Sequence, residues 1–114
     1  MQLSETDKMA LEFNKSVRKR FGNRVDGLCI ENVIDDPNWR AFEISFEAYN
    51  YFNIRMSYDR GSFGWSIYGG KHMISLKSSQ KWFEKADFDV FFEEMKEEIE
   101  SRIPDKFLKK HGWI

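Results

Sequence analysis

The chain has 114 residues, of which 17% are aromatic and 32% are charged, and its formal net charge is −1. This length is typical of one domain with its own core, and the abundance of aromatic residues argues against a disordered chain. We therefore expect a single domain over residues 1–114. A net charge near zero does not by itself indicate a polyanionic partner.

Cys29 is the one cysteine of the sequence, which excludes an intrachain disulfide and a metal site built from cysteines. The first residues lack the basic and then apolar pattern of a signal peptide, and no apolar run approaches the length of a membrane span. We therefore expect a cytoplasmic protein without a membrane partner. The oligomeric state stays open.

The N-terminal segment has the pattern of an amphipathic helix that begins at Ser4 and stops at Gly22. Asp7 stands three residues after Ser4, as in a capping box, and Gly22 suits a helix C-terminus. Apolar residues between these ends recur at a spacing of four, which places them on one stripe. The residues of this stripe are Met9, Phe13, Val17 and Phe21.

Apolar and polar residues alternate between residues 40 and 76, as in strands with one buried face. The sequence predicts a meander of four strands and a candidate fifth, over Leu28–Ile34, Arg40–Glu47, Tyr51–Tyr58, Phe63–Tyr68 and Lys71–Leu76. Turn residues occupy Asp35–Asn38, Ala48–Asn50, Asp59–Ser62 and Gly69–Gly70. The last three turns predict these pairs: Phe46 with Phe52, Ile44 with Ile54, Tyr58 with Phe63, Met56 with Trp65, Ile67 with His72, Trp65 with Ile74 and Phe63 with Leu76.

The C-terminal part has a second helical pattern that starts at Asp87 and ends at Pro104. A short helix from Pro104 to Lys110 follows, and Trp113 is expected to fold back onto the body. The second apolar stripe contains Phe88, Phe91, Phe92, Met95, Ile99 and Ile103. Together the elements predict an α+β fold: an antiparallel meander of four to five strands with an N-terminal and a C-terminal helix on one face.

Catalytic and metal-binding motifs are missing from the sequence. The two histidines lie far apart, and the nucleophile-elbow, phosphate-loop and dinucleotide patterns are incomplete. We therefore expect a protein that is not an enzyme and that has neither a cofactor nor a metal. An enzyme whose site is assembled from dispersed residues remains an alternative.

Acidic residues are concentrated in the second helix. Between Glu84 and Glu100 there are eight acidic residues against two lysines. Such a face can serve solubility alone, or it can be a docking surface for a basic partner with Val90 as a small apolar contact. The predicted contact residues on this helix are Val90, Glu93, Glu94, Glu97, Glu98 and Glu100.

The polar face of the predicted sheet forms a second acidic surface. In the expected register Glu31, Glu43 and Arg55 form a row across three strands. Glu47 and Tyr51 lie beside this row, and Arg55 neutralises part of its charge. This face is the second predicted partner-binding surface.

Nucleic-acid binding is an alternative function, because six basic residues and one acidic residue lie between Lys8 and Arg24. Arg18, Lys19 and Arg24 would contact phosphates, while Tyr51 and Tyr68 would stack on single-stranded bases. The acidic residues of the sheet oppose this interpretation, and cations at a helix C-terminus explain the basic run equally well.

A small α+β chain with few cysteines, acidic surfaces and no visible active site resembles bacterial immunity proteins. The resemblance covers the whole chain in size, architecture and charge, without a diagnostic motif. It implies a protein that binds and neutralises a toxin or nuclease domain, commonly a basic one. The chain also resembles, more loosely, acidic secretion chaperones, which usually work as dimers and have a different order of strands and helices.

Overall fold

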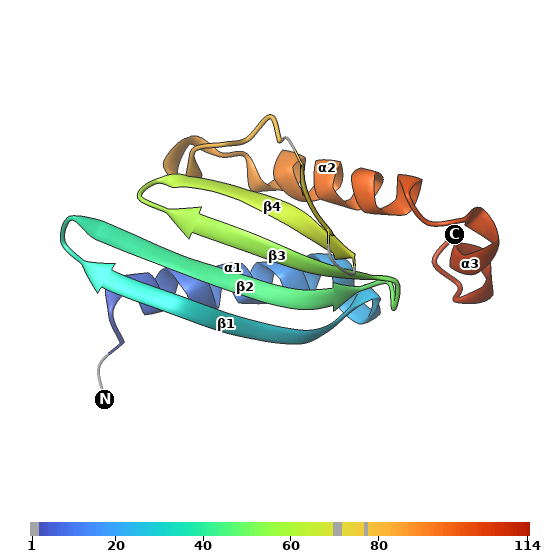
Figure 1. The fold of residues 1–114 in the computed structure, drawn as a ribbon, viewed down its shortest axis with the longest axis horizontal. Coiled ribbons are helices and arrows are strands. Elements are labelled where there is room, and N and C mark those ends of the chain that lie inside the picture. The colour runs from blue at the N-terminus through green and yellow to red at the C-terminus, as the bar shows by residue number, and fades with distance from the viewer. Residues whose placement is uncertain (1–2, 70–71, 77) are drawn as a thin grey trace.

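The computed structural model describes residues 3–69, 72–76 and 78–114. Its elements follow one another as an N-terminal helix, a five-stranded meander and two C-terminal helices (Figure 1). In chain order the elements are α1 (Glu5–Phe21), η1 (Gly22–Arg24), β1 (Val25–Asp36), β2 (Trp39–Ala48), β3 (Phe52–Asp59), β4 (Ser62–Gly69), β5 (His72–Leu76), η2 (Phe83–Lys85), α2 (Phe88–Ser101) and α3 (Asp105–Lys110).

Helix α1 begins and ends where its capping residues predict. The Ser4 hydroxyl accepts a hydrogen bond from the Asp7 amide, and the Asp7 carboxylate accepts one from the Ser4 amide, which completes the capping box. Gly22 ends the helix with a positive φ of 54°. A further contact was not visible in the sequence: Asp35 of β1 accepts hydrogen bonds from the Thr6 hydroxyl at 2.6 Å and the Thr6 amide at 3.2 Å.

The sheet has the strand order β1-β2-β3-β4-β5 with every neighbouring pair antiparallel, which confirms the meander. Strand β5 confirms the candidate fifth strand, although Lys71 lies outside the described residues. Strand β1 is longer at both ends than predicted and has two register shifts, where Gly27 and Asn32 adopt φ values of 64° and 53°. These shifts are bulges, which disrupt the regular pairing edge of an outer strand.

The predicted register between β2 and β3 is wrong by two residues. Phe52 pairs with Ala48, and Ile54 pairs with Phe46. The connection consists of residues 49–51, so Tyr51 lies in the turn and not in the strand. Tyr49 is fully buried and adopts a φ of 58°, a conformation that aromatic residues seldom have and that the sequence does not signal. A shift of two residues preserves the face on which each side chain lies.

The pairs across the β3–β4 turn are confirmed, since Tyr58 pairs with Phe63 and Met56 with Trp65. Across β4 and β5 the predicted register is also wrong by two residues. The observed pairs are Gly69 with His72, Tyr68 with Met73, Ile67 with Ile74 and Trp65 with Leu76. The two residues between the paired Gly69 and His72 are therefore 70 and 71, not the predicted 69 and 70; residues 70 and 71 lie outside the described residues.

The core lies between the inner face of the sheet and helices α1 and α2; in Figure 1, α1 passes behind the strands and α2 lies beside β4. Both predicted helical stripes contribute to it, with Phe13 and Phe92 in aromatic contact at 5.4 Å between ring centroids. The predicted α+β fold with both helices on one face is thus confirmed. No described helix has both the length and the apolar character needed to cross a bilayer.

The C-terminal segment folds back as expected. Asp87 caps α2, Pro104 precedes α3, and Gly112 has a φ of 73°. The Trp113 indole then donates a hydrogen bond to the Asn23 side chain at 3.3 Å. Helix α3 is thereby held at the end of the sheet that carries the β2–β3 turn, close to the end of α1 (Figure 1).

Candidate functional site

The outer face of the sheet has no helix over it (Figure 1). Alternation places the odd-numbered residues of β2 and β3 on this face, because the even-numbered ones form the core. Predicted contact residues Glu43, Glu47 and Arg55 therefore point outward, and Glu31 joins them through its pairing with Glu43. The structure brings together these four residues of the predicted sheet surface.

A cluster around Arg55 occupies the middle of this face. Arg55 pairs with Ser45 across the strands, not with Glu43 as the predicted row required. Its guanidinium nevertheless lies 3.2 Å from the Glu43 carboxylate and 4.0 Å from that of Glu31. The Glu31 carboxylate also accepts a hydrogen bond from the Ser45 hydroxyl at 2.7 Å. One cation thus holds two carboxylates in place and leaves the cluster negative.

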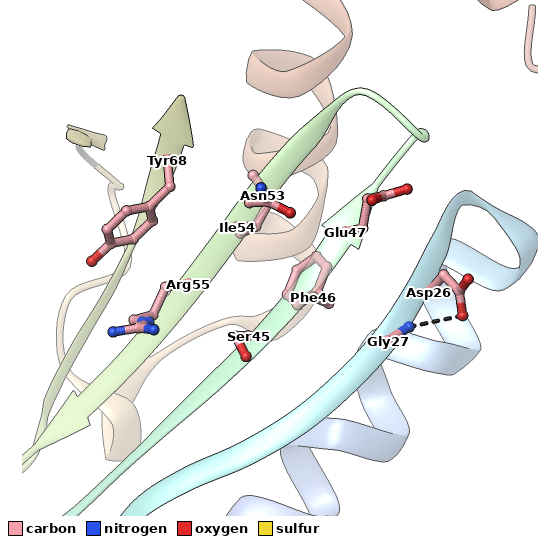
Figure 2. Close-up of a pocket in the computed structure, with 9 residues that line it drawn as sticks. All are labelled: Asp26, Gly27, Ser45, Phe46, Glu47, Asn53, Ile54, Arg55 and Tyr68. Atoms are coloured by element: carbon pink, nitrogen blue, oxygen red, sulfur yellow. Dashed lines mark hydrogen bonds between the residues drawn. The ribbon is translucent and has the colours of Figure 1, made fainter. Parts of the chain in front are cut away.

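A hollow of about 520 Å³ lies beside this cluster, towards the β2–β3 turn (Figure 2). The Arg55 guanidinium and the Tyr68 ring border it together, with 5.2 Å between them. On the other side are the carboxylates of Asp26 and Glu47, which come from directly opposite residues of β1 and β2. Neither carboxylate forms an ion pair with a described residue.

The opposite end of the outer face carries two exposed tryptophans that were not predicted as contact residues. Trp39 is 43% exposed, and its indole donates a hydrogen bond to Asp59 at 3.0 Å while Arg60 stacks on its ring. Hydrogen bonds from Arg60 and from Trp39 hold the pKa of the Asp59 carboxyl below its ordinary value. Trp39 has the same parity as Glu43, so its position on this face was visible in the alternation.

Trp82 is 59% exposed and had no signal in the sequence. It lies in the connection after β5, and its backbone forms an isolated antiparallel bridge with Ser62, the first residue of β4. Backbone hydrogen bonds from Phe63 to Lys81 and from Phe83 to Gly61, both of 2.9 Å, fix this bridge. Trp39 and Trp82 therefore flank the β3–β4 turn at one end of the sheet.

The acidic residues of α2 divide into two groups. Glu94 accepts hydrogen bonds from Ser78 and from the Ser79 hydroxyl, the latter at 2.8 Å, and Glu100 accepts one from the Tyr49 hydroxyl. Glu98 forms an ion pair with Arg102 at 3.6 Å. Three of the predicted helical contact residues thus have intramolecular partners, while Glu93, Glu97 and Val90 are exposed.

Tyr51 does not belong to the sheet surface. Its ring packs edge-to-face against Phe52 at 4.8 Å and against Phe107 of α3 at 5.1 Å. Tyr51 and Tyr68 therefore do not form the common stacking surface that the nucleic-acid alternative assumed. The reason is the longer β2 strand, which moves Tyr51 into the turn.

Within residues 3–69, 72–76 and 78–114, no group of three or more His, Cys, Asp or Glu side chains has the geometry to hold a metal ion. The outer face offers carboxylates, aromatic rings and one central guanidinium, which are groups that recognise another molecule by charge and shape. No protein-family model, curated protein or solved structure matches the chain.

Proposed function

We propose that this chain is a non-enzymatic, cytoplasmic protein-binding module. It binds and neutralises a basic toxin or nuclease domain, and the outer face of its sheet is the contact surface. Partner recognition uses the carboxylates around the hollow and the two tryptophans at the far end. No cofactor takes part.

The opposition of Asp26 and Glu47 carries this proposal. Like charges directly opposite each other destabilise an antiparallel pair, and neither carboxylate forms an ion pair with a described cation; Asp26 accepts a hydrogen bond from the Gly27 amide at 2.8 Å. The free protein therefore keeps an unfavourable interaction that a lysine or arginine of a partner would relieve. The hollow between these carboxylates and Tyr68 provides room for such a side chain.

The aromatic end supports the same surface. Tryptophan, tyrosine and arginine dominate the binding energy of protein interfaces, and the outer face exposes Trp82 and also Trp39, on whose ring Arg60 stacks. An acidic face also raises the association rate with a basic partner, and this effect weakens with salt.

Helix α2 is the less favourable of the two predicted surfaces. Glu94 and Glu100 already accept hydrogen bonds within the chain, so a partner would compete with those contacts. Glu93, Glu97 and Val90 remain available as a second surface.

The experiment compares two double variants that make the same change in charge. Asp26→Lys with Glu47→Lys alters the sheet, and Glu93→Lys with Glu97→Lys alters the helix. Tagged wild-type protein is used to isolate its partner from the native host, and the affinity of each variant for that partner is then measured. Inhibition of the partner's toxic or nuclease activity by wild-type protein is assayed in parallel.

We expect a basic partner whose activity wild-type protein inhibits, and a large loss of affinity for the sheet variant alone. A loss confined to the helix variant would move the contact surface to α2. A partner that is acidic, or whose activity is unchanged in the complex, would contradict the proposal.

A further inference from the structure

Basic residues from two distant segments lie at the end of the molecule that carries α3 (Figure 1). The hydrogen bond between Trp113 and Asn23 holds the last helix next to the end of α1. Arg20 in the last turn of α1 forms an ion pair with Asp89, but six other basic residues of these segments form none with a described residue. We call them the basic end: Arg18, Lys19, Arg24, Lys106, Lys109 and Lys110.

Helix dipoles account for only part of this arrangement. The last turns of α1 and α3 both contain basic residues, which suits the negative ends of two helices. Each helix C-terminus corresponds to about half an elementary negative charge. Asp105 of α3 and Asp26 beside Arg18 offset a further part, and the six cations still leave an excess of positive charge.

An exposed aromatic ring lies beside these cations. Tyr51 is 45% exposed, and its ring is held by edge-to-face contacts with Phe52 and Phe107. Phe107 follows Lys106 in α3, so the helix that holds the Tyr51 ring also carries the α3 cations. A ring fixed in this way loses little freedom when a base stacks on it.

We propose that the basic end binds single-stranded nucleic acid, with phosphates on the cations and a base stacked on Tyr51. A duplex keeps its bases stacked on one another, so an aromatic platform favours single strands. This site adjoins the acidic outer face, since Arg18 and Asp26 line one small hollow, but it does not depend on the function proposed for that face. Phe107 supports the Tyr51 ring in this site, and Tyr68 does not belong to the site.

The test uses fluorescein-labelled oligo(dT) and oligo(U) of about 15 nucleotides, a length within the range that single-strand binding sites cover. Fluorescence anisotropy gives the dissociation constant at salt concentrations from about 50 to about 200 mM. Lys109→Glu with Lys110→Glu removes two cations of the basic end. Lys81→Glu with Lys85→Glu makes the same change in charge near Trp82 and is the matched control.

We expect salt-dependent binding that the Lys109→Glu, Lys110→Glu variant weakens, with the slope of log K against log salt reduced by about two. The control variant should retain most of the affinity. Tyr51→Leu keeps apolar packing against Phe52 and Phe107 but removes the stacking ring, so binding should weaken about tenfold.

Three outcomes would overturn the inference. The first is no binding at the lowest salt, the second is an equal loss of affinity for the control pair and the α3 pair, and the third is wild-type affinity of Tyr51→Leu. In the last case, equal or tighter binding of heparin would identify a surface for polyanions in general. Circular dichroism melting curves establish that each variant is folded.

Discussion

The Tyr49 hydroxyl donates a hydrogen bond of 2.6 Å to the Glu100 carboxylate, which joins the β2–β3 turn to the last turn of α2. Tyr49 is fully buried although its φ is 58°, and its ring contacts Trp113 edge-to-face at 5.3 Å. One turn residue therefore holds together the sheet, the second helix and the C-terminal segment. The strained backbone at this position is offset by those contacts.

Tyr49→Phe should lower the free energy of unfolding by about 1–3 kcal/mol, because it removes a hydrogen bond to a charged group and leaves a half-buried carboxylate without this donor. Tyr51→Phe is the matched control, since the Tyr51 hydroxyl makes no hydrogen bond with a described residue. Urea denaturation measures both variants. Equal stability of the two would show that the Glu100 contact contributes nothing.

Alkaline pH should lower the stability of the fold through the same contact between Tyr49 and Glu100. Burial, and then the Glu100 carboxylate, raise the pKa of the Tyr49 hydroxyl well above its ordinary value of 10.0. The folded state thus holds this proton more tightly than the unfolded state, so the associated stability is present below pH 10 and declines as the pH rises above it. Denaturation at a series of pH values should show a steeper alkaline decline for wild type than for Tyr49→Phe.

Acidic pH should lower the stability of the fold through protonation of Asp35. Hydrogen bonds from the Thr6 hydroxyl and amide hold the pKa of this carboxyl below its ordinary value of 3.8. The associated stability is therefore present above pH 3.8 and is lost as the pH falls through the lower folded-state pKa. The free energy of unfolding of Asp35→Asn should therefore decline less steeply at acidic pH than that of wild type. Asp36→Asn is the control, because an amide oxygen can still accept the hydrogen bond from the Asn38 amide.

The two faces of the sheet should respond differently to the loss of a tryptophan. Trp65 is 4% exposed within the core, so Trp65→Ala should lower the free energy of unfolding by about 3–5 kcal/mol. Trp82 is 59% exposed, so Trp82→Ala should change it by less than about 0.5 kcal/mol. Urea denaturation of both variants measures the difference. Similar losses would mean that Trp82 packs against the body of the protein.

Periodicity identified the faces of the sheet and both helical stripes, because these depend on spacing within one segment. The register depended on turns, and Tyr49 is a residue that would not be assigned a positive φ from the sequence. Both errors were of two residues, so Glu43 and Arg55 were placed on the correct face but with the wrong cross-strand partners. The sequence could not show that Glu94 and Glu100 have intramolecular partners while Glu93 and Glu97 have none among the described residues, because the partners of Glu94 and Glu100 come from distant segments.

A single substitution on the outer face should separate stability from binding. Glu47→Lys places a cation opposite Asp26, and an opposite-charge pair across two strands contributes about 0.2–1 kcal/mol. The free energy of unfolding should therefore increase, while the affinity for a basic partner falls because the acidic surface loses charge. Glu12→Lys is the control, since this exposed residue of α1 makes the same change in charge on the helical side of the molecule. Urea denaturation and a binding titration measure the two effects, and a stabilised Glu47→Lys variant that binds its partner as wild type does would exclude the hollow from the interface.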